Sequence, residues 1–78
     1  METMNLTQLE SGQSGEVVFI EGGRNVTCKL SVMGIRVGVT VTKITSQLMR
    51  GPVSIQVGGT QLAIGYGMAR RIIVEVDE

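Results

Sequence analysis

Residues 53–64 read VSIQVGGTQLAI, and this stretch decides the fold class. Apolar residues alternate with polar ones from Val53 to Val57, which is the period of a strand with one buried face. Gly58-Gly59 can adopt the positive φ angles of a tight two-residue turn, and alternation resumes over residues 62–64. The stretch therefore predicts a β-hairpin.

Three further segments are typical of short strands. Residues 16–21 (EVVFIE) form an apolar run between turn-forming residues, and residues 72–76 (IIVEV) alternate again. Residues 37–45 alternate at first and then change phase, which indicates a β-bulge near Lys43. The predicted order is therefore two strands before the hairpin and one after it.

One helix is expected between the first two strands. Val26, Leu30 and Met33 recur at i, i+4 and i+7, which places them on one face of a helix. Val32 and the cysteine one turn before it would widen that apolar face. Gly34 stands where a helix commonly ends, because glycine adopts the left-handed conformation without strain. The predicted helix therefore ends near Gly34.

The composition favours a small mainly β domain. The chain has 78 residues, is 42% hydrophobic but only 3% aromatic, and contains 11 glycines. The core must therefore be aliphatic, and the backbone can make many tight turns. A chain of this length suits one domain, residues 1–78. Because closure removes exposed sheet edges, we expect a small barrel of about five strands with one short α-helix after the first strand. Short helical turns are expected at residues 5–9 and 65–71.

Charge and cysteine content exclude several classes of protein. Seven basic and seven acidic residues give a net charge of zero, which argues against a nucleic-acid partner. No apolar run approaches the roughly 20 residues that span a bilayer, and the N-terminus lacks the pattern of a signal peptide. We therefore expect a cytoplasmic protein with no direct membrane insertion. The single cysteine, Cys28, cannot form an internal disulfide.

Three stretches resemble the FeoA family. Residues 30–39 (LSVMGIRVGV) are similar to the family's helix end, Leu-x-x-Leu-Gly-Leu-x-x-Gly followed by a strand, with Met33 at the second leucine. Residues 51–55 (GPVSI) are similar to its glycine-proline lead into the next strand. Residues 62–64 and 69–74 (LAI and ARRIIV) are similar to its closing Ala-Leu-Arg and Ala-x-x-Ile-x-Val patterns, with Gly65 where many members carry arginine.

The resemblance covers the chain from about Leu6 to Val76, and it implies an SH3-like barrel. It also implies a non-enzymatic cytoplasmic accessory protein of bacterial ferrous-iron uptake. Such a protein would bind and modulate FeoB, the GTPase-linked membrane permease for ferrous iron. An alternative stays open, namely a metal-responsive regulatory module similar to the SH3-like domain of iron-dependent repressors.

No pattern in the residues predicts a metal, cofactor or catalytic site. The cysteine and five methionines are soft ligands, but such residues are ordinary core fillers. The carboxylates are dispersed, and only Glu75, Asp77 and Glu78 lie close enough in sequence for a weak terminal site. Without histidine, a serine or cysteine nucleophile would have only a lysine or a carboxylate as its base. We therefore expect no enzyme, no cofactor and no metal ligand.

A partner-binding surface is the remaining candidate site. Ile35 follows the helix, and Leu48 and Met49 lie in the next loop, where a barrel this small cannot bury every apolar side chain. Arg70 and Arg71 could contact an acidic partner or an anionic membrane surface, although a solvated face explains them too. We expect all five residues to bind the permease, while packing over an open barrel end also suits the apolar three. A weak homo-oligomer is compatible with the sequence.

Overall fold

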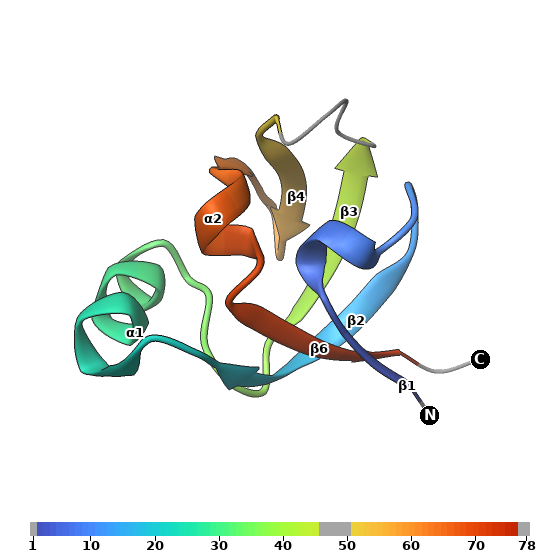
Figure 1. Ribbon diagram of the computed structural model, residues 1–78. Coiled ribbons are helices and arrows are strands. Elements are labelled where there is room, and N and C mark those ends of the chain that lie inside the picture. Colours follow the sequence, from blue (N-terminus) through green and yellow to red (C-terminus); the bar gives the residue numbers. More distant parts are fainter. Residues whose placement is uncertain (1, 46–50, 77–78) are drawn as a thin grey trace.

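The computed structural model describes residues 2–45 and 51–76, which form one antiparallel sheet with helical connections (Figure 1). The strands are ordered β1-β6-β2-β3-β4-β5 across the sheet. In chain order the elements are β1 (Glu2–Asn5), the 3₁₀ helix η1 (Leu6–Gln8), β2 (Ser14–Ile20), α1 (Gly23–Val32), β3 (Thr40–Thr45), β4 (Val53–Val57), β5 (Thr60–Ile64), α2 (Tyr66–Ala69) and β6 (Ile72–Val76).

The mainly β fold is confirmed, but the prediction of a closed barrel of about five strands needs correction. The sheet has six strands and is open, because β1 and β5 stand at its two ends and do not pair with each other. The strand that the sequence did not reveal is β1, which pairs with β6 from Glu2↔Val76 to Asn5↔Ile73. The residues of β1 are mostly polar, and β1 has a neighbouring strand on one side only. Its sequence therefore lacks the alternation of apolar and polar residues by which the other strands were predicted.

The last strand of the chain lies inside the sheet, between β1 and β2 (Figure 1). Ile72, Val74 and Val76 are all buried, as their alternation predicts. Gly15 of β2 packs against this strand: a Cβ atom at Gly15 would come within 2.9 Å of Val74 Cγ2. Real Cβ atoms do not approach that closely, so a glycine is needed where β2 pairs with β6.

The core is aliphatic throughout, as the composition predicts. Every strand except β1 contributes buried side chains, and η1, α1, α2 and Ile35 add others. The lone phenylalanine, Phe19, does not belong to it, since 56% of Phe19 is exposed. The buried cluster comprises Leu6, Leu9, Val17, Ile20, Leu30, Ile35, Val41, Val53, Ile55, Ile64, Ala69, Ile72, Val74 and Val76.

Helix α1 ends in a turn that carries the chain back onto the core. Gly34 has a φ of +88° and donates its amide proton to the Ser31 carbonyl at 2.9 Å. The Ile35 amide donates to the Leu30 carbonyl, also at 2.9 Å, which completes a Schellman motif. In this motif the residue after the glycine packs against the last helical turn, and both Ile35 and Leu30 are fully buried. The expectation that Ile35 is exposed is therefore wrong.

The residues before β3 form a β-turn rather than the predicted strand. The Val39 amide donates to the Arg36 carbonyl at 3.1 Å, and Gly38 has a φ of +99°, which suits the third position of a type II turn. Strand β3 therefore begins at Thr40 and not at Val37. The predicted bulge near Lys43 is confirmed, because the register with β4 shifts between Lys43 and Thr45.

Lys43 is a buried lysine that fastens η1 to β3. Only 2% of its surface is exposed, and its Nζ atom donates to the Leu9 carbonyl at 2.8 Å and to the Thr7 carbonyl at 3.2 Å. Asn5 caps η1 by accepting from the Thr7 amide, and the Gln8 side chain accepts from the Asn5 amide, so the helical turn expected at residues 5–9 is present with a capping box. Burial lowers the pKa of the Lys43 ammonium group from its ordinary value of 10.5.

Because Lys43 is buried, the free energy of unfolding should change with pH in the alkaline range. The unfolded chain keeps the ordinary lysine pKa of 10.5, while the folded protein has a lower one, so the unfolded state binds more protons between the two values. We expect the free energy of unfolding to rise with pH in that window in the parent, and not in Lys43→Met, which cannot titrate. Denaturant unfolding of both proteins across an alkaline pH series measures the difference. Parallel pH profiles would contradict a depressed Lys43 pKa.

Candidate partner-binding surface

The fold separates charges that cancel in the net count. All seven basic residues lie between Arg24 and Arg71, and all seven acidic residues lie outside that span. Helices α1 and α2 therefore carry no acidic residue, whereas Glu2, Glu16 and Glu75 lie on β1, β2 and β6. The net charge of zero conceals this pattern, although the spacing of the charged residues along the sequence already contains it.

Apolar side chains are exposed where the chain leaves α1. We call Val32, Met33 and Val37 the helix-exit patch; their exposed fractions are 88%, 39% and 62%. Val32 is the last residue of α1, Met33 caps it, and Val37 lies in the turn that Gly38 closes. The basic residues Lys29 and Arg36 flank the patch in sequence, and both are exposed. The patch is therefore apolar with a basic margin.

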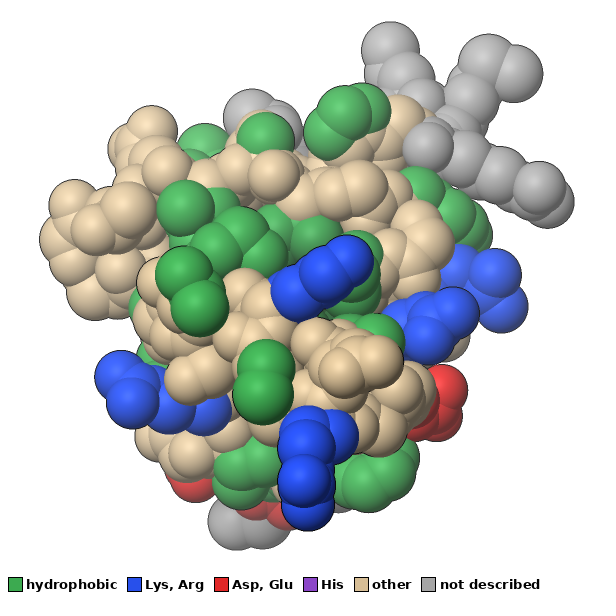
Figure 2. Space-filling model, turned by 90° about the vertical axis from the view of Figure 1, so that its left-hand side faces the viewer, with side chains coloured by type: hydrophobic (Ala, Val, Ile, Leu, Met, Phe, Trp, Pro, Cys, Tyr) green, Lys and Arg blue, Asp and Glu red, His purple; other side chains and the backbone are tan. Residues whose placement is uncertain are grey.

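Figure 2 views the side of the molecule that carries α1. Lys and Arg side chains are scattered among hydrophobic ones across this side, and the acidic side chains in view lie at its lower and right margins. The mixture of apolar and basic groups suits contact with a partner that presents apolar and acidic groups.

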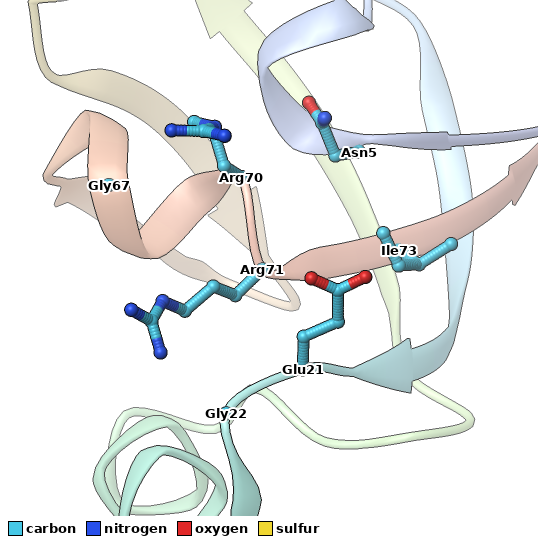
Figure 3. A pocket seen from close by; sticks show the side chains of 7 residues that line it. All are labelled: Asn5, Glu21, Gly22, Gly67, Arg70, Arg71 and Ile73. Atoms are coloured by element: carbon cyan, nitrogen blue, oxygen red, sulfur yellow. The ribbon is translucent and has the colours of Figure 1, made fainter.

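Arg70 and Arg71 lie at a different corner, between α2 and β6. They line an open hollow of about 480 Å³ together with Asn5, Glu21, Gly22, Gly67 and Ile73 (Figure 3). The two guanidinium groups point in different directions, and the Glu21 carboxylate lies in the same hollow (Figure 3). The two guanidinium groups therefore do not converge on one binding site for an anion.

The Arg71 side chain lies over the start of α1. A Cβ atom at Gly22 would come within 2.7 Å of a terminal guanidinium nitrogen of Arg71, and Gly22 has a φ of +108°. The Glu21 amide donates to the Arg71 carbonyl at 2.7 Å. The arginine corner and the beginning of α1 are thus held together by the backbone.

The predicted site residues do not form one surface. Ile35 belongs to the core, Arg70 and Arg71 are exposed at their own corner, and Leu48 and Met49 lie outside the described residues. Of the predicted apolar site residues that the structure describes, Ile35 is buried instead of exposed. Val32 and Val37 were missed, because helix and strand periodicity assigned both to buried faces. For Val37 the signal is Gly38, whose positive φ closes the β-turn that presents Val37 to solvent, whereas Val32 lies within α1 and no such signal marks it.

Other kinds of site find no support in the part of the chain that the structure describes. In residues 2–45 and 51–76 there is no group of three or more His, Cys, Asp or Glu side chains that could hold a metal ion. Within the same ranges, no helix is both long enough and apolar enough to cross a membrane. The buried lysine Lys43 has a lowered pKa, but its ammonium group is occupied by two main-chain carbonyls.

Comparison with known proteins agrees with this architecture. The sequence model of the FeoA domain matches residues 4–76, which is nearly the whole chain. The chain belongs to the FeoA family. An Fe(2+) transport protein A of Methanocaldococcus jannaschii is 36% identical over 66 residues, covering 85% of this chain and 78% of the relative. The resemblance inferred from the three sequence stretches is thus confirmed.

Solved FeoA structures share the fold closely. The crystal structure of an iron uptake regulatory protein, FeoA, is 39% identical and superposes with a TM-score of 0.87, covering 96% of this chain and 97% of that one. The FeoA of Stenotrophomonas maltophilia, described as a prokaryotic SH3 domain protein and solved with zinc, is 24% identical with a TM-score of 0.78, covering 92% and 89%. The SH3-like character of the fold is therefore supported.

A transcriptional repressor contains the same fold as one part of a longer chain. A manganese-dependent transcriptional repressor superposes with a TM-score of 0.88 at 17% identity, and the match covers 99% of this chain but 38% of the repressor. At this level of identity the likeness concerns the fold of the FeoA domain alone.

Proposed function

We propose that this chain is a non-enzymatic accessory protein of ferrous-iron uptake that acts in the cytoplasm by binding and modulating an FeoB-type permease. Membership of the FeoA family supports the transport role, since relatives bear the names iron uptake regulatory protein and Fe(2+) transport protein A. The observation that carries the binding role is the helix-exit patch. It is an exposed apolar surface in the acid-free part of the chain.

The exposed side chains of this patch contribute little to the stability of the fold. Fully burying a valine stabilises a protein by about 1.5–3 kcal/mol, and a chain this short needs most of its apolar side chains inside. Val32 and Val37 nevertheless remain largely exposed. Burial against a partner would recover that free energy, which is the physical reason for placing the permease contact here.

The basic margin defines the chemistry of the permease surface. Lys29 and Arg36 are exposed beside the patch, and Arg24 stands at the start of the same helix. A complementary surface would combine apolar side chains with carboxylates at its rim. Such a rim steers association and makes the affinity fall as salt increases. Arg70 and Arg71 would contact the permease only if the interface extends to their corner.

The substitution Val37→Glu tests the patch directly. We expect it to weaken binding to the purified permease by about 1–3 kcal/mol, the range for loss of an interface anchor. Folding should hardly change, because Val37 is exposed in a turn. Calorimetric titration and circular dichroism melts of each variant measure the two effects.

Two controls separate binding from folding. Gln56→Glu introduces the same charge at an exposed position on β4 and should bind as the parent does. Ile55→Glu places a carboxylate in the core and should unfold the protein. If Val37→Glu binds as tightly as the parent, the helix-exit patch is not part of the interface. If Val37→Glu melts at a lower temperature than the parent, its loss of binding is due to loss of folding.

The regulatory alternative makes a different prediction about metal. An FeoA of another organism was solved with zinc, but the described residues of this chain group no three candidate ligands. We expect anaerobic calorimetry to show ferrous and zinc ions binding no tighter than to a generic acidic surface, since histidine is absent and the carboxylates are dispersed. Stoichiometric binding at micromolar affinity would favour the metal-responsive module instead.

A further inference from the structure

The two free edges of the sheet differ in charge. At one edge, β1 carries Glu2, and its neighbour β6 carries Glu75. At the other edge, β5 carries no charge, and residues 51–69 contain no Asp, Glu, Lys or Arg. Proteins usually protect free edges with charges or proline, because unpaired main-chain groups invite another strand. The β1 edge has such protection and the β5 edge does not.

The register shows which main-chain groups β5 leaves free. Val57 and Thr60 bracket the two-residue turn, so they form a hydrogen-bonded pair, and such pairs alternate along the hairpin. Leu62 therefore bonds to β4, while the N–H and C=O groups of Gln61 and Ala63 point away from it. The hydrogen bonds of Lys43 agree with this alternation. Its amide and carbonyl bond to Gln13 and Gly12, on the side of β3 away from β4. Ile55, which lies opposite Lys43, therefore directs its main-chain groups toward Leu62 on β5.

The outward groups on β5 have no partner in the part of the chain that the structure describes. β5 is the end of the strand order and pairs with β4 only. Within residues 2–45 and 51–76, no hydrogen bond reaches the outward main-chain groups of Gln61 or Ala63. The side chains of both residues are exposed and line a hollow of about 270 Å³ with Ile44, Ser54 and Leu62.

We propose that β5 pairs in antiparallel fashion with β5 of a second copy of this chain, about a two-fold axis at Leu62. The axis places Gln61 opposite Ala63 of the partner subunit, so each of these residues both donates and accepts. The four main-chain hydrogen bonds use every outward group at these positions. Leu62 then faces the partner's Leu62 as a non-hydrogen-bonded pair, in which side chains approach most closely.

Three features favour a second copy over an unrelated strand. The neutral edge offers no charge with which to select a foreign partner, and a two-fold arrangement brings no like charges together along β5. Leu62 packs against the core and is only partly buried, so Leu62 of the partner subunit would extend the apolar contact. The assembly also stops at a dimer, because the pairing uses the β5 edge of both copies and the remaining β1 edges carry acidic residues.

The dimer would form only at high protein concentration. One short strand pair buries less than the roughly 1,200 Å² of a standard stable interface. The proposal goes beyond the accessory role and does not rest on it, since the helix-exit patch belongs to α1 and its exit turn.

Sedimentation equilibrium of the full chain, in a concentration series that reaches the millimolar range, tests this pairing. We expect a monomer–dimer equilibrium in the parent. In Ala63→Pro and Gln61→Lys the dissociation constant of the dimer should be at least about tenfold larger. Proline removes an outward N–H that β4 does not use, and lysine places like charges on both strands. Thr40→Lys adds the same charge on β3, away from this edge, and should dimerise as the parent does.

Amide hydrogen exchange locates the contact. We expect the protection of the Gln61 and Ala63 amides to rise with protein concentration, because pairing buries both donors. If Ala63→Pro fails to fold, Gln61→Lys and the exchange data decide. A parent that stays monomeric, variants that dimerise as tightly as the parent, or unchanged protection at both amides would each overturn the proposal. Assemblies that grow beyond a dimer would indicate β5 pairing with β1 and overturn the two-fold arrangement.

Discussion

The contact between β2 and β6 holds this molecule together. The final strand of the chain lies between the first two, and Gly15 lets β6 approach so closely that Val74 occupies the space of a missing side chain. Val17, two residues further along β2, is fully buried and binds the exit turn of α1 on its other side. Its amide donates to Val39 and its carbonyl accepts from Gly38, each at 2.8 Å.

The position of the candidate interface follows from that contact. The hydrogen bonds of Val17 hold the β-turn that projects Val37 outward, and the Schellman motif just before it turns Ile35 inward. Helix α1 lies at one side of the molecule (Figure 1). A packing constraint at the centre of the sheet therefore determines which apolar side chains remain at the surface. The fold also sorts charge: acidic residues lie on β1, β2 and β6, basic residues on α1, and a neutral hairpin forms the far edge.

Much of the fold could be predicted from local patterns, because those patterns have local causes. The hairpin at Gly58-Gly59, the bulge near Lys43 and the buried alternation of β6 each depend on a few neighbouring residues. Strand β1 could not be predicted, since its only support is pairing with the opposite end of the chain. The candidate site was predicted less well. Periodicity counts residues along an ideal helix or strand, and it fails where a glycine with positive φ reverses the chain, as it does before Ile35 and after Val37.

The most direct test of the account is site-specific photo-crosslinking in living cells that express the permease. A photoreactive residue at Val37 would report contacts of the helix-exit patch, and one at Glu16, exposed on β2, would report contacts of the acidic side. We expect the FeoB-type permease to be captured from position 37 and not from position 16. Capture of the permease from position 16 alone, or from neither position, would contradict it.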